Sequence, residues 1–153
     1  AGDADHVFGV LQAANAELSV LKVAMRPGKP VTVATLGEIM VLGLPGNPFA
    51  AAVTFHQIAL PAIKASAGIR EIWPQRFSAV SGFSYPHKAG RTEFVPVTWS
   101  ARDEAGRPVL AMLGRGSSAS LSPFASAKAL AILTADAGDI VPGVPVDIEL
   151  LCE

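Results

Sequence analysis

The chain has 153 residues, a length that suits one ordinary domain or two small ones. Hydrophobic residues make up 50% of the sequence and charged residues 16%, so a substantial core can be buried. The net charge of −1 argues against general nucleic-acid binding, and the single cysteine, Cys152, excludes both a disulfide framework and a cysteine-based metal site within one chain. This composition predicts an intracellular, cytoplasmic protein without a nucleic-acid partner.

The first part of the chain is predicted to form one helix and three strands. Residues 6–17 carry apolar side chains at helical spacing. Strands are predicted at 19–25, 31–36 and 38–44. The last of these is apolar without clean alternation, which is typical of a strand buried on both faces. We therefore expect the end of an α/β unit with a partly parallel sheet.

A second helix is predicted directly after the third strand. Asn47 suits the N-cap position and Pro48 the first helical position, where a missing N–H costs nothing. Pro61 is expected to bend or locally open this helix, and Gly68 is expected to end it. The uncharged stretch 39–63 is long enough for a membrane span, but the Pro/Gly turn interrupts it, so no membrane partner is expected.

The sequence changes character around residues 69–74, after which short strand-like runs alternate with turns. This pattern predicts a small all-β domain, either a barrel or a tight sandwich. The predicted strands are 75–81, 92–100, 108–113, 129–134 and 144–151.

Three cations surround a rigid turn near the start of the chain. Lys22, Arg26 and Lys29 lie within eight residues, around the Pro27-Gly28 pair, and no acidic residue occurs between Glu17 and Glu38. Cations beside a glycine turn favour a phosphate, molybdate or carboxylate ligand. The alternative is a solvated surface turn.

The segment Gly43-Leu44-Pro45-Gly46-Asn47-Pro48 is a second candidate for anion binding. A helix N-terminus presents unpaired N–H groups and the positive end of the helix dipole, here at the predicted edge of a parallel sheet. The alternative is a tight strand–helix connection that binds nothing. The segment matches neither a P-loop nor a G-x-G-x-x-G motif, so neither pattern predicts a nucleotide site.

The β domain contributes two further candidates. In Gly114-Arg115-Gly116-Ser117-Ser118 the glycines allow successive N–H groups to converge on an anion beside a guanidinium and two hydroxyls, unless the segment is simply a hairpin tip. Arg91 is predicted at the start of a strand, where it either binds a ligand or is an ordinary surface arginine.

Asp3 and Asp5 precede the first predicted helix. Two carboxylates near a phosphate site are able to hold Mg²⁺, whereas N-capping is the simpler alternative. The three histidines are scattered and lack metal-ligand spacing, and no Ser-His-Asp or Cys-His arrangement is indicated.

Taken in order, these motifs resemble those of the molybdopterin molybdenumtransferases, the family of MoeA and the gephyrin E-domain. The resemblance covers nearly the whole chain and corresponds to the C-terminal portion of that family. Its five motifs here are residues 2–5, 22–30, 43–48, 90–94 and 114–118. It implies that residues 1–70 are the C-terminal part of a MogA-like, pterin-binding α/β domain. Residues 74–153 would be a C-terminal β-barrel domain.

The resemblance also implies an activity within a longer enzyme. Family members insert molybdate into adenylylated molybdopterin and release AMP with the help of Mg²⁺. A homodimer and a MogA-like adenylyltransferase partner are implied as well. A pterin-binding module without turnover and a gephyrin-like anchoring domain are the alternatives. Carried over by motif, the catalytic positions are Asp5, which also binds the metal, with Lys22, Arg26, Arg91 and Ser117, and the substrate-binding positions are Lys29, Pro45, Gly46, Asn47, Pro48 and Gly116.

Overall fold

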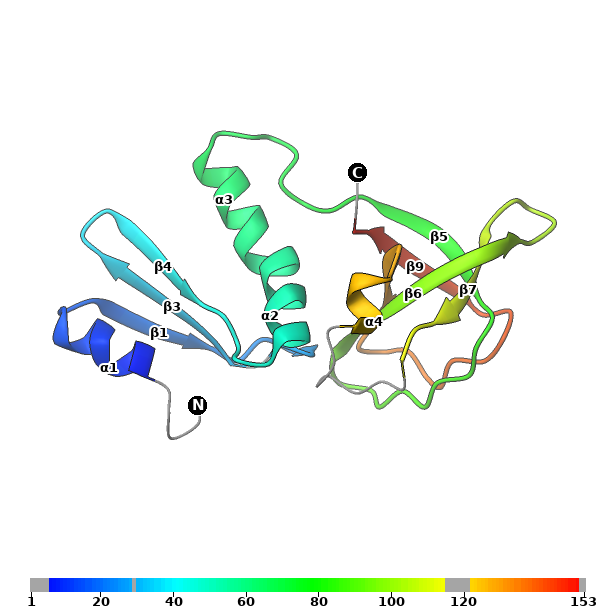
Figure 1. The fold of residues 1–153 in the computed structure, drawn as a ribbon, viewed down its shortest axis with the longest axis horizontal. Coiled ribbons are helices and arrows are strands. Elements are labelled where there is room, and N and C mark those ends of the chain that lie inside the picture. Colours follow the sequence, from blue (N-terminus) through cyan, green and yellow to red (C-terminus); the bar gives the residue numbers. More distant parts are fainter. Residues whose placement is uncertain (1–5, 29, 115–121, 152–153) are drawn as a thin grey trace.

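The computed structural model describes residues 6–28, 30–114 and 122–151. In Figure 1 a small sheet stands at one end, a β-barrel at the other, and a long helix between them. The order of elements along the chain confirms an α/β fragment followed by a barrel-like all-β domain.

The N-terminal sheet is an antiparallel array of three strands in the order β1-β3-β4, preceded by α1. Its elements are α1 (His6–Ala13), β1 (Glu17–Leu21), β3 (Val31–Leu36) and β4 (Ile39–Gly43). Between β3 and β4 the chain has only Gly37 (φ 59°) and Glu38, a connection too short for a parallel crossover. The expectation of a partly parallel sheet is therefore wrong for the described strands of this small sheet.

Two further expectations for this sheet are wrong. Strand β4 is not buried on both faces, because it lies at the sheet edge with Ile39 63% and Met40 48% exposed. The predicted strand 19–25 is split, because the chain leaves the small sheet after Leu21. It then forms β2 (Met25–Arg26), which pairs in parallel with a strand of the barrel.

The central helix is continuous from α2 (Pro48–Thr54) through a π-helical turn, η1 (Phe55–Ala59), into α3 (Leu60–Ser66). The π turn directly precedes Pro61, which has no N–H and cannot make the usual helical hydrogen bond to the carbonyl four residues back. Within the turn, Leu60 N–H donates to Phe55 O, five residues back, as is typical of a π-helix. Gly68, at φ 75°, ends the helix as predicted. No helix among the described residues is long and apolar enough to cross a membrane.

Five strands close the barrel in the order β6-β7-β5-β9-β8, with a further pairing between β6 and β8 completing the ring. Each lies close to a predicted strand. They are β5 (Arg76–Ser81), β6 (Thr92–Arg102), β7 (Pro108–Met112), β8 (Ala129–Leu133) and β9 (Pro145–Leu150). A short helix, α4 (Ser122–Ala125), lies between β7 and β8 and was not predicted.

Alternation along the barrel strands divides the apolar residues into two clusters. Val95 and Val97 of β6 and Ala131 of β8 point into the barrel core. Their neighbours Phe94 and Leu130 point outward, into a second cluster. Its other buried members are Met25, Phe49, Val53 and Ile132. Strand β8 is therefore buried on both faces, and the second cluster attaches the central helix to the outer wall of the barrel.

A cationic pocket between the sheet, the helix and the barrel

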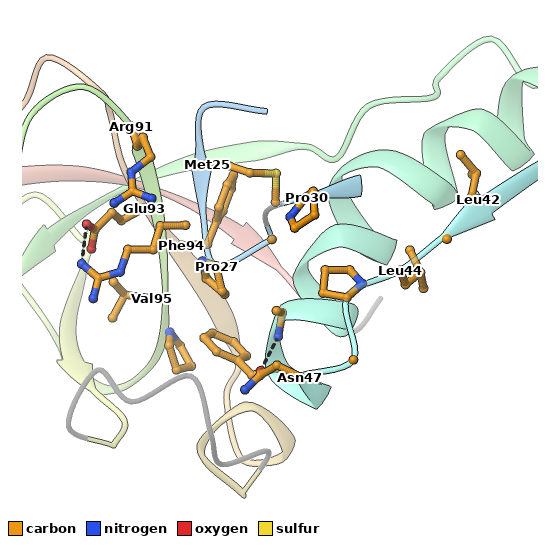
Figure 2. Close-up of a pocket in the computed structure, with 18 of the residues that line it drawn as sticks. Met25, Pro27, Pro30, Leu42, Leu44, Asn47, Arg91, Glu93, Phe94 and Val95 are labelled. Carbon is orange, nitrogen blue, oxygen red and sulfur yellow. Dashed lines mark hydrogen bonds and ion pairs between the residues drawn. The ribbon is translucent and has the colours of Figure 1, made fainter. Parts of the chain in front are cut away.

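A cavity of about 650 Å³ lies where the small sheet, the start of α2 and strand β6 meet. In Figure 2, Arg91, Glu93 and Phe94 stand on the barrel side, Leu42, Leu44 and Asn47 on the other, and Pro27 and Pro30 between. Three of the segments singled out from the sequence, far apart in the chain, therefore share one pocket.

The turn before α2 forms one wall of this cavity. Asn47 has extended backbone angles (φ −73°, ψ 125°), and its side-chain oxygen accepts a hydrogen bond from Ala50 N–H at 3.0 Å. This is the predicted N-cap, with Pro48 following at the helix start. Pro45, Gly46 and Asn47 line the pocket, so a helix N-terminus and its dipole lie at the cavity wall.

Replacement of Asn47 by alanine removes that cap. We expect Asn47→Ala to lower the free energy of unfolding by about 1 kcal/mol, because Ala50 N–H loses its acceptor. Urea denaturation of both proteins measures the difference. Ser66→Ala is the control: it removes a hydroxyl that donates to Ala62 O at the exposed end of the same helix, and should cost less. Equal losses for the two variants would contradict a special role for the cap.

The cationic turn forms the floor between the two walls. Met25 is buried, and Gly28, at φ 126°, is packed so closely against Met25 and Thr54 that an added Cβ would clash with both. Lys22 is exposed and is not among the described residues that line the cavity. Lys29 lies outside the described residues.

Arg26 is not free on the turn, as the sequence had suggested, but lies in β2 opposite Glu93 of β6. Its Nη1 donates to Glu93 Oε1 at 3.1 Å, and its side chain is 53% exposed whereas that of Glu93 is 4% exposed. Tyr85 O–H donates to Glu93 Oε2 at 2.8 Å. Burial, together with the hydrogen bond to Glu93 and the charge of Glu93, raises the pKa of Tyr85 above 10.0, so its hydroxyl remains a donor.

Arg91 lines the same cavity from the position just before β6 and is exposed. Its loop is held to the 134–140 segment: Gly90 N–H donates to Ala135 O at 2.7 Å. The buried His87 ring lies between them, with Nδ1 3.1 Å from Ala137 O and Nε2 3.3 Å from Arg91 O. The barrel therefore positions Arg91 through its backbone, and no hydrogen bond of its guanidinium is found among the described residues.

The structure brings together some of the predicted site residues. Arg26, Pro45, Gly46, Asn47 and Arg91 line one cavity, whereas Lys22 and Pro48 are not among its described lining residues. The predictions for Asp5, Lys29, Gly116 and Ser117 lie outside the described residues.

Sequence reasoning missed Tyr85 and Glu93 as pocket residues. A single acid at the head of the apolar run Phe94-Val95-Pro96-Val97 was the available signal for Glu93, because an isolated carboxylate in a buried strand needs partners. For Tyr85 no such signal exists, because its contact with Glu93 depends on the loop between β5 and β6.

The lining of the pocket combines charged and apolar side chains. Arg26, Arg91 and Glu93 are the charged groups among its described lining residues. Phe49, Phe94 and Pro96 supply apolar surface, beside Leu113 and Pro123. An α/β unit and a β-barrel thus share a pocket of a size typical for small molecules, suited to a ligand that is partly anionic and partly apolar.

The described residues do not fit a magnesium site. They contain no group of three or more His, Cys, Asp or Glu side chains close enough to hold a metal ion. The carboxylate described in the pocket, Glu93, already accepts from Arg26 and Tyr85.

Two family matches follow one another along the chain. Residues 1–65 match a family described as a probable molybdopterin binding domain. Residues 78–151 match the MoeA C-terminal region (domain IV). The chain belongs to the MoeA family of molybdopterin molybdenumtransferases and corresponds to its C-terminal portion.

Individual relatives agree with this family. The chain is 31% identical over 150 residues to the molybdopterin molybdenumtransferase of Haemophilus influenzae, covering 97% of this chain and 36% of that protein. It is 39% identical over 95 residues to the protein of the same name from Nostoc sp., covering 60% of this chain and 22% of that protein. The chain thus spans about a third or less of these relatives' length.

The fold is also that of a solved relative. The structure matches the molybdopterin biosynthesis MoeA protein of Pyrococcus horikoshii with a TM-score of 0.74 and 23% identity, covering 98% of this chain and 36% of that one. At this identity the match supports the fold.

Proposed function

We propose that this chain acts in molybdenum cofactor biosynthesis as part of a molybdopterin molybdenumtransferase. In this proposal its pocket binds adenylylated molybdopterin and molybdate, and the enzyme inserts the metal with release of AMP. The observation that carries the proposal is the shared cavity, in which the cationic turn, the 43–48 turn and Arg91 meet although they are distant in sequence.

The two kinds of side chain in the pocket suit the two parts of such a ligand. Phe49 and Phe94 offer apolar surface to a heterocycle, and the turn at Asn47 offers a helix N-terminus to a phosphate. Arg26 and Arg91 offer guanidinium groups to the oxyanion. Catalysis would then consist of holding the reactants close together and offsetting the negative charge during transfer.

Several finer assignments belong to this proposal. Residues 1–70 would form the end of the pterin-binding domain and residues 74–153 the barrel domain. Asp5 would hold Mg²⁺, and the protein would act in the cytoplasm as a homodimer supplied by a MogA-like adenylyltransferase. The half-exposed apolar residues of the small sheet, among them Val20 and Ile39, support an association surface there.

The proposal is tested by calorimetric titration of the chain with adenylylated molybdopterin, with and without molybdate. We expect Arg91→Ala to weaken binding about tenfold or more, the loss of one charge-assisted contact. Arg102→Ala is the matched control, because Arg102 is the last residue of β6, the strand that follows Arg91, is exposed, and donates to Gly106 O in the hairpin. It should bind as tightly as the unchanged chain.

Each outcome of this titration has a distinct meaning. Binding that Arg91→Ala weakens and Arg102→Ala leaves unchanged supports the pocket as the ligand site. An equal effect of both variants, or no binding by the unchanged chain, contradicts it. Binding without release of AMP, measured by chromatography of the products, would indicate a pterin-binding module in place of a complete enzyme.

A further inference from the structure

Among the described lining residues, the negative charge comes from one buried acid. Glu93 lies opposite Arg26 in the parallel β2–β6 pair, where its carboxylate is held on both oxygens, by Arg26 and by Tyr85. Figure 2 shows this carboxylate on the same side of the pocket as Arg91. Among the described lining residues, two guanidinium groups and one carboxylate leave a single net positive charge.

We propose that Glu93 is a specificity-determining residue: by offsetting the charge of Arg26, it prevents free tetrahedral anions such as sulfate and phosphate from occupying the pocket by charge alone. The proposal rests on the proposed function, because it assumes that the true ligand is a larger molecule with both an anionic and an apolar part. Such a ligand gains binding energy at the wall of Phe49, Phe94 and Pro96, which a bare inorganic anion does not contact productively.

The magnitude of the charge effect supports this role. A unit charge a few ångströms from an anion changes the affinity for that anion by about fivefold where water screens it well, and by far more where water is excluded. Screening at the Glu93 carboxylate is limited, because only 4% of that side chain is exposed. Removing its charge should therefore affect a small anion strongly. A ligand held partly by apolar contacts should be affected less.

The role of Tyr85 in this arrangement is to position the carboxylate. Its hydroxyl donates a hydrogen bond to Oε2 of Glu93, while Oε1 of Glu93 accepts from Arg26. The chain has one tyrosine, so the ultraviolet absorbance of tyrosinate reports on this residue alone. In a variant without the Glu93 charge the pKa of Tyr85 should fall back toward 10.0, because two of its raising influences come from Glu93.

The test compares the unchanged chain with Glu93→Gln, titrated with sodium sulfate and separately with adenylylated molybdopterin by calorimetry at constant ionic strength. We expect Glu93→Gln to bind sulfate about tenfold more tightly, while its affinity for the pterin ligand changes by less than about threefold. Glu104→Gln, which removes the same charge from an exposed residue outside the described lining of the pocket, is the matched control. It should bind sulfate with nearly the affinity of the unchanged chain.

A second neutral variant keeps the test decisive if Glu93→Gln does not fold, as judged by circular dichroism. Glu93→Ala makes the same charge change, and its shortened side chain opens onto the cavity. Sulfate affinity unchanged in the folded neutral variant would overturn the inference about Glu93, and so would an equal gain for both ligands. Failure of the unchanged chain to bind the pterin ligand would instead count against the proposed function, whatever sulfate does.

Discussion

Replacing Glu149 with alanine should lower the free energy of unfolding by about 3 kcal/mol, because it removes the anion from a buried polar cluster. Glu149 lies in β9 with 1% of its side chain exposed, on the outer barrel wall beneath the central helix. Its Oε1 accepts from Arg76 Nε at 3.1 Å, its Oε2 accepts from Gln57, and His56 Nε2 lies 3.5 Å from Oε2. The cluster therefore ties η1 to β5 and β9.

Urea denaturation of Glu149→Ala against the unchanged chain measures this loss. The value is set at the low end of the range for buried pairs, because Arg76 is 54% exposed and regains water when its partner is removed. Asp147→Ala is the matched control: Asp147 occupies the same strand but is exposed, and its removal should change stability little. A similar small change for Glu149→Ala would show that the cluster adds no stability.

The same cluster predicts how stability depends on pH. Burial alone would raise the pKa of Glu149, but the contacts with His56, Gln57 and Arg76, together with the charge of Arg76, outweigh it and lower the pKa below 4.5. A lowered folded-state pKa contributes stability above the unfolded value and loses it as pH falls through the folded value. The unchanged chain should therefore lose more stability below pH 4.5 than Glu149→Ala does.

Replacing Gly28 with alanine should also cost about 3 kcal/mol, from backbone strain and overpacking together. Gly28 has φ 126°, a conformation that residues with a side chain rarely adopt. An added Cβ would stand 2.6 Å from Met25 Cε and 2.7 Å from Thr54 Oγ1, both in buried residues. The methionine methyl can shift, but the short threonine side chain has little room to do so.

Gly37→Ala separates strain from crowding in this experiment. Gly37 also has a positive φ, 59°, but an added Cβ there would meet nothing within 4 Å. Gly37→Ala should lower the free energy of unfolding by about 1 kcal/mol, because it introduces the backbone strain but no steric clash. Urea denaturation of both variants measures the difference. Equal losses would mean that the cationic turn is not packed tightly against α2.

The sequence correctly predicted local features, those that depend on only a few neighbouring residues. The N-cap at Asn47, the opening of the helix before Pro61 and its end at Gly68 all follow from backbone and side-chain chemistry within one turn. The barrel strands were readable for a similar reason, since alternation at Val95 and Val97 sorts the core from the outer face. The order of the motifs along the sequence also indicates the family.

Pairings between distant segments were decided only by the tertiary structure. Apolar content at Ile39 and Met40 does not say whether a strand is central or at an edge, so the burial of β4 was predicted wrongly. Nor does sequence show that Met25 and Arg26 leave one sheet to pair with β6 of the barrel.

That pairing determines the character of the site. It places Arg26 opposite Glu93, sixty-seven residues away, and so changes a presumed free cation into one member of an ion pair. The sequence by itself determined which residue types are present and which local turns they form. The fold decided which of them meet, because loop closure and strand register depend on the packing of the whole chain and not on any short segment.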